Sequence, residues 1–292
     1  MSEALAGTEA VAAGTSGVGA PAAGTGTGAT AGGTGQRDRW RSRGLGLVLP
    51  ALLLAAWAAA ARTGLLPASL LPGPGVVLRT LAGMAADGSL GRDLRATGFR
   101  LGAGFGLGAS AGIGLGGLVG AVPAARRMLD PTVQGLRSVP SIAWVPLFIL
   151  WFGIFDTSRV LLIAVGVFFP VYLNLSAAVA GVDRRLLEVG RVHGMGPFER
   201  LRRIALPASL PGLLVGLRGG LGLGWMFVAA AELMGASEGL GFELEDGDQT
   251  GRPERIIAAL IVFALCGKAT DLLLVVAGRP LVSWQDTEGE RR

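Results

Sequence analysis

Long apolar blocks alternate with short charged segments from Gly44 to Trp284. Six blocks predict six membrane-spanning helices, because a helix needs about 20 mostly apolar residues to cross a bilayer core. The first block is short for a span, and the third is short unless it begins near Val133. The pattern predicts an all-α, polytopic membrane protein. The expected spans are Gly44–Ala61, Phe99–Val122, Val139–Gly153, Val160–Val182, Ala208–Met234 and Ile256–Ala277.

Composition and charge agree with a membrane protein. The chain is 51% hydrophobic and 16% charged, whereas soluble domains carry about 25% charged residues. The net charge of +5 does not indicate nucleic-acid binding, because the arginines lie mostly between the apolar blocks. If both termini are cytoplasmic, the inner segments hold 15 arginines and the outer segments seven. Arginine accumulates on the cytoplasmic side of membrane proteins, so we expect both termini there.

Residues 1–36 differ in composition from the rest of the chain. They are mostly Gly, Ala and Thr, which bury too little apolar surface to offset the entropy of ordering. They also lack the charged start and continuous apolar region of a signal peptide. The basic segment Arg37–Arg43, with one Trp, is typical of an anchor among cytoplasmic headgroups. We expect a disordered cytoplasmic tail with a basic cluster at 1–43, a transmembrane domain at 44–284 and a cytoplasmic tail at 285–292.

Rows of small residues follow the second and fifth expected spans. Residues four apart stack on one helix face, and small faces let helix backbones approach closely in lipid. The second span has two rows about 200° apart, which predicts a helix sandwiched between neighbours. The rows are Gly104, Gly108, Gly112, Gly116 and Gly120; Gly102, Gly106, Ser110 and Gly114; and, on the fifth span, Gly212, Gly216, Gly220 and Gly224.

Few side chains suit catalysis or metal binding. The sequence holds one cysteine (Cys266), one histidine (His193) and one lysine (Lys268). These counts exclude a disulfide within the chain and Cys-based or His-rich metal sites. Lys268 lacks the glycine and hydroxyl neighbours of a phosphate-binding loop, so ATP hydrolysis would require a partner. We expect no cofactor and no metal.

A charged segment separates the fourth and fifth spans and has the pattern of a helix–turn–helix. Residues 186–193 predict one short helix, and Gly194 and Gly196 allow a turn because glycine tolerates positive φ. Pro197 suits the first turn of a second helix, which we expect to end before Pro207.

The spacing within this segment, 181–207, resembles the coupling loop of ABC-importer permeases. That loop reads E-A-A, three residues, G, nine residues, I-x-L-P, and here the two Ala positions hold Val and Gly. The resemblance implies docking on an ATPase subunit. The alternative is that the glutamate pairs with neighbouring arginines in water, where a pair contributes about 0–1 kcal/mol. The matching residues are Glu188, Gly194, Ile204, Leu206 and Pro207.

From about Pro72 to Trp284 the chain resembles the permease subfamily that serves nitrate, sulfonate, taurine and related solutes. The resemblance implies the ABC type I importer permease fold in a bacterial-type cytoplasmic membrane. It also implies a permease homodimer among membrane lipids, cytoplasmic ATPase subunits and an extracytoplasmic solute-binding protein. The solute stays open between sulfonate, taurine, nitrate and a molecule like a thiamine precursor. The matching residues are Leu71–Pro74, Arg137–Pro140, Ala143, Pro146–Leu147, Trp151–Gly153, Phe168–Pro170, Asn174, Gly216–Arg218, Gly222–Leu223, Trp225, Ala231–Glu232 and Gly235–Ser237.

Polar side chains inside the expected spans are functional candidates. Arg218 either meets an anionic solute or extends toward the inner headgroups. Glu232 lies near the outer end of the same span and is expected to reach the interface. Lys268 and Asp271, three residues apart, are expected to pair. Asn174 follows a proline kink, where a freed carbonyl and a polar side chain can line a path. Together with Arg218, it is our candidate for the translocation path.

Two other classes of protein compete with the ABC permease. An ion-coupled secondary transporter would be built from internal repeats with broken helices, and no convincing repeat relates the two halves of this sequence. A membrane-bound enzyme would need a cluster of nucleophile, acid, base or metal ligands, which one His, one Cys and one Tyr hardly provide. Only the ABC permease gives the segment 181–207 a role.

Overall fold

The computed structural model describes residues 34–63, 67 and 69–282, in which every regular element is helical. The chain separates into two compact units, Met1–Leu53 and Leu54–Arg292. Helix α1 (Thr34–Thr63) crosses this boundary, so the domain limit expected at residue 44 falls inside a helix. Most of the tail expected at 1–43 and all of the tail expected at 285–292 lie outside the described residues.

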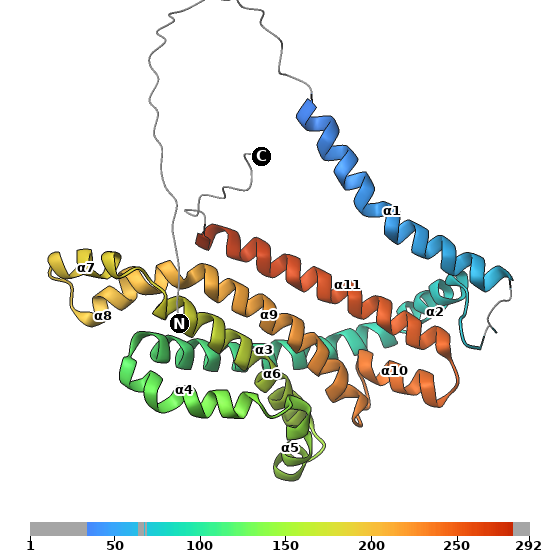
Figure 1. Cartoon of the computed structure of the whole chain (residues 1–292). Helices are drawn as coiled ribbons and strands as arrows, with labels where there is room; N and C mark the ends of the chain where they lie inside the picture. The colour runs from blue at the N-terminus through green and yellow to red at the C-terminus, as the bar shows by residue number, and fades with distance from the viewer. Residues whose placement is uncertain (1–33, 64–66, 68, 283–292) are drawn as a thin grey trace, which may run out of the picture. The chain divides into compact units, whose positions relative to one another are not determined.

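The second unit is a set of helices joined by short connections (Figure 1). No span was expected at two of these helices, α2 and α10. In chain order the elements are α2 (Pro74–Ala86), α3 (Ser89–Ala121), α4 (Pro123–Arg137), η1 (Ser141–Trp144), α5 (Val145–Phe152), α6 (Asp156–Ala180), α7 (Arg184–Val192), α8 (Pro197–Arg200), η2 (Leu201–Ala205), α9 (Leu206–Leu233), α10 (Leu240–Gln249), α11 (Pro253–Gly278) and η3 (Arg279–Val282).

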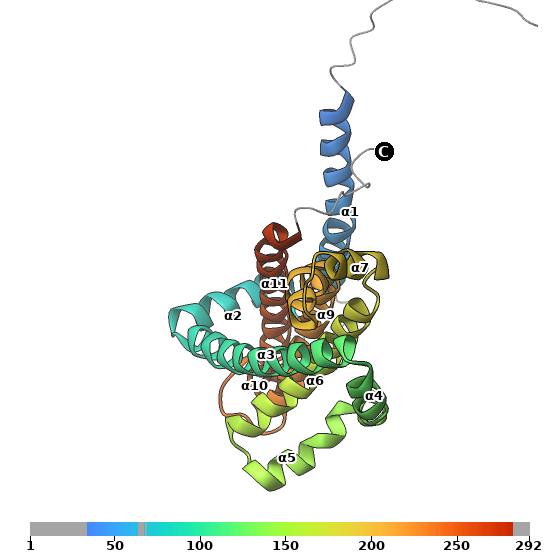
Figure 2. The ribbon, with the colours of Figure 1, turned by 90° about the vertical axis from the view of Figure 1, so that its left-hand side faces the viewer.

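Helix α6 packs against both α3 and α9 and forms the centre of the unit (Figure 2). Its side chains Ile163, Val167 and Val171 are completely buried, in one cluster with Leu101 of α3 and Val228 of α9. Lipid tails are as apolar as these side chains, so in a membrane van der Waals packing must hold the helices together. Close fit between α3, α6 and α9 is therefore the main source of their association.

The first glycine row of α3 allows this close fit. A methyl group added at Gly112 would lie 2.9 Å from the Val171 Cβ, and one at Gly116 would lie 2.9 Å from the carbonyl oxygen of Tyr172. The glycine row of α9 faces the same helix, since a methyl at Gly216 would lie 3.0 Å from the Cβ of Asn174. The predicted packing role of both rows is confirmed.

The second small-residue row of α3 has a different environment. A methyl at Gly102, Gly106 or Gly114 would meet nothing within 4 Å among the described residues. Among the described residues the second row therefore has no close neighbour, and the expected sandwich of α3 is seen only on the face of the first row, which packs on α6.

Four of the six expected spans correspond to helices long and apolar enough to cross a membrane: α3, α6, α9 with the turns before it, and α11. Helix α3 begins at Ser89, well before the expected Phe99. The expected start is too late because the first turns of the helix carry polar side chains, which lower the local hydropathy although they are buried in the structure. The apolar part of α1, Val48–Thr63, is shorter than these four helices.

The third expected span, Val139–Gly153, corresponds to η1 and α5, which follow a sharp bend after α4. Helix α4 and the segment Ser141–Phe152 meet at 90°. Pro140 explains the break, because the residue before a proline is pushed away from the helical conformation. The helix resumes with Pro146 in the first turn of α5, a position that suits proline. The third span therefore does not extend in a straight line back to Val133, and the bent pair counted as one crossing gives five spans.

The glycine face makes a testable prediction. Gly108→Ala should lower the melting temperature of the detergent-purified protein, because its new methyl would collide with the carbonyl oxygen of Ala164 and lie 2.9 Å from the Val167 Cβ. Overpacking of this kind costs about 1–3 kcal/mol. Gly106→Ala, on the open face of the same helix, is the matched control and should be neutral or stabilising. Equal melting temperatures for the two variants would contradict the packing of α3 on α6.

Candidate functional site

The segment 181–207 forms a compact helical projection, which we call the knob. Asp183 caps α7 by accepting a hydrogen bond from the Arg185 backbone N–H at 2.9 Å. Gly194 ends the helix with φ +73°, and the N–H groups of Gly194 and Met195 donate to the carbonyls of Arg191 and Gly190. This is the glycine-based C-terminal motif of helices. The predicted turn at Gly194 is present, whereas Gly196 has φ −66° and needs no glycine conformation.

The second half of the knob differs from the expectation. Helix α8 begins at Pro197 as predicted, but the helix does not end before Pro207. It widens into a π-turn over Leu201–Ala205, with the Leu206 N–H bonded to the Leu201 carbonyl, and continues into α9. A π-turn accommodates a helix defect without breaking the helix, and Pro207 then occupies the first turn of α9, where proline is tolerated.

Close contact between α7 and the π-turn holds the knob together. Gly190 is buried, and a methyl there would lie 2.7 Å from the Cδ1 of Ile204 and 3.0 Å from the Cγ of Arg200. Ile204 is therefore an internal contact of the knob. Leu206 is exposed and Pro207 half-buried at the start of α9.

The outer surface of the knob carries exposed apolar side chains and a carboxylate among exposed arginines. Val192 is 86% exposed and Phe198 76% exposed. Glu188 is also exposed and makes no ion pair with any described residue, so pairing with the neighbouring arginines does not occupy it. Exposed apolar side chains grouped in this way are typical of a protein interaction surface.

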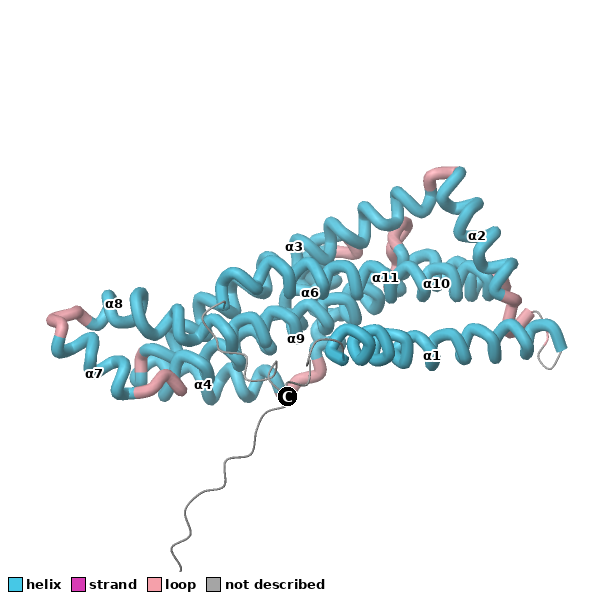
Figure 3. Tube along the Cα trace, turned by 90° about the horizontal axis from the view of Figure 1, so that it is seen from above, coloured by secondary structure: helices cyan, strands magenta, loops and turns pink. Residues whose placement is uncertain are grey.

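Helices α7 and α8 lie toward one end of α9 and α10 toward the other (Figure 3). A buried polar cluster lies at the end away from the knob, around Glu232 of α9. Glu232 is 0% exposed and accepts hydrogen bonds from Arg100 at 2.8 Å and from the Thr97 hydroxyl at 2.9 Å. Arg100 also donates to Asp156 at 2.8 Å. The expectation that Glu232 reaches the interface is wrong, because Arg100 neutralises it within the bundle.

The same cluster fixes α10 and the turn before it. The backbone N–H groups of Gly239 and Gly241 donate to Asp93 at 2.9 Å and to Glu232 at 2.8 Å. The Leu240 N–H donates to the Thr97 hydroxyl at 2.9 Å. Glu243 is buried beside this turn, and desolvation raises the pKa of its carboxyl above the usual range. Because α3, α6, α9 and α10 all contribute, the cluster locks this end of the bundle.

The charged residues of α9 and α11 pair differently from the expectation. Arg218 donates through Nε and Nη2 to the two carboxylate oxygens of Asp271, at 2.8 and 3.0 Å. Lys268 is exposed and makes no ion pair with a described residue. The predicted Lys268–Asp271 pair is therefore wrong. Arg218 and Asp271 line a groove of about 480 Å³ together with Leu221, Gly222, Trp225, Ala229, Leu244, Leu260, Phe263, Ala264 and Gly267.

Asn174 lies between α6 and α9. Its side-chain amide donates to the Pro170 carbonyl at 2.9 Å, and its Cβ contacts the backbone of α9 at Gly216. The amide thus satisfies a carbonyl one turn earlier on its own helix.

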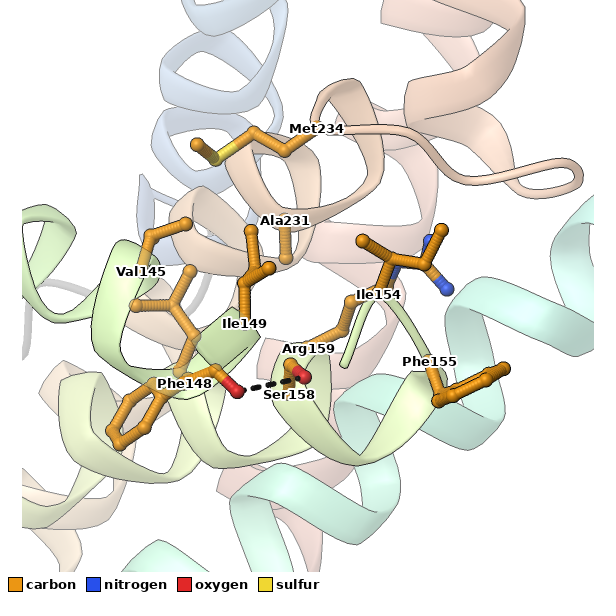
Figure 4. Close-up of a pocket in the computed structure, with 10 residues that line it drawn as sticks. Val145, Phe148, Ile149, Ile154, Phe155, Ser158, Arg159, Ala231 and Met234 are labelled. Atoms are coloured by element: carbon orange, nitrogen blue, oxygen red, sulfur yellow. Dashed lines mark hydrogen bonds between the residues drawn. The ribbon is translucent and has the colours of Figure 1, made fainter. Parts of the chain in front are cut away.

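A second, much smaller cavity lies where α5, α6 and α9 meet (Figure 4). Its volume is about 20 Å³, close to the space of one water molecule. The hydroxyl of Ser158 donates to the Phe148 carbonyl at 3.3 Å across it. The cavity is too small for an organic solute.

Sequence reasoning missed the buried partners on α3. Asp93, Thr97 and Arg100 follow one another at spacings of four and three, which place them on one face of a helix. That polar face was a usable signal, but Asp93 and Thr97 lie before Phe99, the start expected for the second span.

Comparison with known proteins adds to this geometry. The family model described as a binding-protein-dependent transport system inner membrane component matches residues 104–279. The putative aliphatic sulfonates transport permease protein SsuC of Bacillus subtilis is 39% identical over 242 residues, which cover 83% of this chain and 88% of that protein. The taurine transport system permease protein TauC of Escherichia coli is 33% identical over 259 residues, covering 85% and 94%.

Among solved structures, a chain of the MetNI methionine ABC transporter, in inward-facing conformations, is similar in fold. The TM-score is 0.59 at 20% identity, over 66% of this chain and 96% of that chain.

The buried cluster makes a second prediction. Glu232→Ala should sharply reduce the melting temperature and membrane abundance, because removing one partner of a buried ion pair costs about 3–5 kcal/mol. The double variant Arg100→Met/Glu232→Leu should recover part of the loss, since it leaves no unpaired charge. Asp248→Ala, at an exposed position of α10, is the control. A Glu232→Ala protein as stable as the control would contradict the locking role of the cluster.

Proposed function

The chain belongs to the family of binding-protein-dependent transport system inner membrane components, and from this we propose that it imports an aliphatic sulfonate by means of ATP hydrolysis on a partner subunit. The family confirms the predicted resemblance to ABC-importer permeases of the sulfonate, taurine and nitrate type. It favours this function over the ion-coupled secondary transporter. The apolar helices agree with a multi-pass membrane protein.

Docking of the knob on an ATPase is the step that the geometry supports best. Exposed Val192 and Phe198 offer an apolar surface, and Glu188 offers a carboxylate that makes no ion pair with the part of the chain that the structure describes. Burial of apolar anchors with a charged group at the rim is the usual form of a protein interface. In this proposal Gly194 and Ile204 shape the knob, and Leu206 and Pro207 connect it to α9.

The remaining partners follow from the same proposal. An extracytoplasmic binding protein delivers the solute to the end of the bundle that carries α10. Two copies of the chain enclose the path, which includes Arg218 and Asn174, and both termini are cytoplasmic. The tails at 1–43 and 285–292 flank the transmembrane domain on that side.

A sulfonate is the solute class best supported by the comparisons. Two relatives named as aliphatic sulfonates transport permeases are 39% and 33% identical to this chain over more than four fifths of its length. Taurine and nitrate are the alternatives, from relatives at 33% and 29% identity. Competition between labelled butanesulfonate, taurine and nitrate for uptake separates the three.

Charge reversal on the knob tests the coupling proposal. Glu188→Lys and Gly194→Asp should abolish ATP-dependent uptake while the protein still reaches the membrane. The first places a mismatched charge at the docking surface, and the second forces a side chain into a positive-φ turn, at a cost of about 1 kcal/mol or more. Arg127→Glu, at an exposed position of α4 outside the knob, is the charge-reversal control. Uptake, ATPase co-purification and membrane abundance are measured for each, and normal uptake in both knob variants would refute the proposal.

Membrane orientation is testable with single cysteines in a Cys266→Ser background. A membrane-impermeant maleimide should label Asp248→Cys in intact spheroplasts, but label Arg191→Cys only after permeabilisation. Both positions are exposed in the structure, so access to the reagent depends on the side of the membrane. Labelling of Arg191→Cys in intact spheroplasts would show that the knob faces outward.

A further inference from the structure

The groove between α9 and α11 combines a guanidinium with an apolar wall. Its volume is about 480 Å³, within the range of about 300–1,000 Å³ typical of sites for small molecules. Arg218 and Asp271 lie among its lining residues, and the rest of the lining is almost entirely apolar or aromatic. A groove with one polar pair and an apolar wall is suited to a molecule with a charged head and an apolar tail.

Arg218 is held in place but still accessible. Asp271 accepts from its Nε and Nη2, which fixes the plane of the guanidinium. Its Nη1 has no acceptor among the described residues, and its side chain is 53% exposed. Because guanidinium N–H groups form strong, directed hydrogen bonds with anionic oxygens, the free side of Arg218 is a ready donor to an oxyanion.

The position of the pair argues against a lipid-facing surface. Arg218 lies near the middle of α9, and Asp271 lies well inside α11. Charged side chains within spans face a protein interior or a water-filled cavity rather than hydrocarbon. The face of α9 and α11 that carries this pair must therefore border an aqueous path or another protein surface.

The charged lining residues of the groove are the pair Arg218 and Asp271. Arg218 and Asp271 cancel, and Lys268, one turn before Asp271, acts on the same carboxylate and is exposed. Because Asp271 is already engaged by Arg218 and lies near Lys268, the accessible side of the Arg218 guanidinium favours an anion over a cation.

The apolar wall is rigid. The indole N–H of Trp225 donates to the Thr270 hydroxyl at 2.8 Å, and the Trp225 ring meets the Phe263 ring edge-on with centroids 5.8 Å apart. Leu260 and Ala264 extend the wall along α11. A short alkyl chain can lie against this surface while its head reaches Arg218.

We propose that this groove is a solute site within the permease, which binds an organic anion with its oxyanion head on Arg218 and its aliphatic tail on the wall of Trp225, Phe263 and Ala264. The proposal rests on the proposed function as a sulfonate importer and adds to it a site within the permease itself. It favours alkanesulfonates over nitrate, because nitrate has no tail to fill the apolar part of the groove.

The proposed contact between the oxyanion head of the solute and Arg218 is tested by uptake of radiolabelled butanesulfonate. The proteoliposomes hold the complete transporter and receive loaded binding protein. Vesicles of phosphatidylcholine alone keep anionic lipid headgroups out of the groove. Arg218→Gln should lower uptake by about tenfold or more, since it removes a charged hydrogen-bond donor. The double variant Arg218→Gln/Asp271→Asn should lose as much, which excludes an effect of an orphaned Asp271 carboxylate. Arg218→Lys should restore part of the uptake.

The proposed contact between the aliphatic tail of the solute and the apolar wall is tested by a substitution that fills the groove without changing its charge. Ala264→Phe should reduce butanesulfonate uptake several-fold more than methanesulfonate uptake, because only the longer solute needs the apolar wall. Leu265→Phe, one residue further along α11 and not among the lining residues, is the matched control and should affect neither. Each variant is compared with the wild type on the same loaded binding protein, so the selectivity of that protein cancels.

The outcomes separate this proposal from the proposed function. Wild-type vesicles without ATP-dependent uptake of any solute would refute the proposed function. Normal wild-type uptake of butanesulfonate, with unchanged uptake by Arg218→Gln and its double variant, would overturn the site alone. Equal losses of both sulfonates in Ala264→Phe would also overturn it. ATPase stimulation by loaded binding protein, retained in the variants, would show that a loss arises in the groove rather than in assembly.

Discussion

The close approach of three helix backbones is the constraint on which the rest of the structure depends. Glycine rows on α3 and α9 bring both backbones against α6. Van der Waals contact between closely fitting surfaces therefore holds α6 in place, because burial of apolar side chains gives no advantage over contact with lipid tails. Helix α11 takes little part in this contact and is largely unburied in the chain. Tight packing on one side of α9 and loose packing on the other leave the groove that holds Arg218. The arrangement thus separates a rigid core from a surface that can face a solute.

Two arginines in this bundle show how burial decides the role of an ion pair. Arg100 is almost completely buried and donates to Glu232, to Asp156 and to the carbonyl of Glu238, so it acts as a lock between helices. Arg218 has one carboxylate partner and remains half-exposed. A buried pair is costly to break, whereas a half-exposed guanidinium retains a donor for a ligand. The same residue type therefore stabilises one end of the unit and offers a recognition group near its middle.

Features that depend on local spacing could be predicted from the sequence. The glycine faces and the turn at Gly194 follow from periodicity and backbone preference, and the family followed from fixed distances within the segment 181–207. The ion pairs could not be predicted, because Arg100 and Glu232 are 132 residues apart and Arg218 and Asp271 are 53 apart. Hydropathy also misplaced the start of α3, since it scores polar side chains as exposed even where partners from other helices neutralise them. The bend after α4 had a local cause in Pro140, but the length of the apolar run concealed it.

The π-turn at Leu201–Ala205 has a mechanical consequence. Because it keeps the helix continuous, the knob and α9 form a single lever rather than two parts joined by a hinge. Helix α9 has 28 residues and is therefore roughly 42 Å long at 1.5 Å per residue. A tilt of about 10° imposed at the knob would displace the far end by roughly 7 Å on this length. That far end carries Glu232, which is bonded to α3 and α10. The lever would therefore move the locked cluster together with the ends of α3, α6 and α10, and a small rotation at the knob would become a large translation at the opposite end of α9.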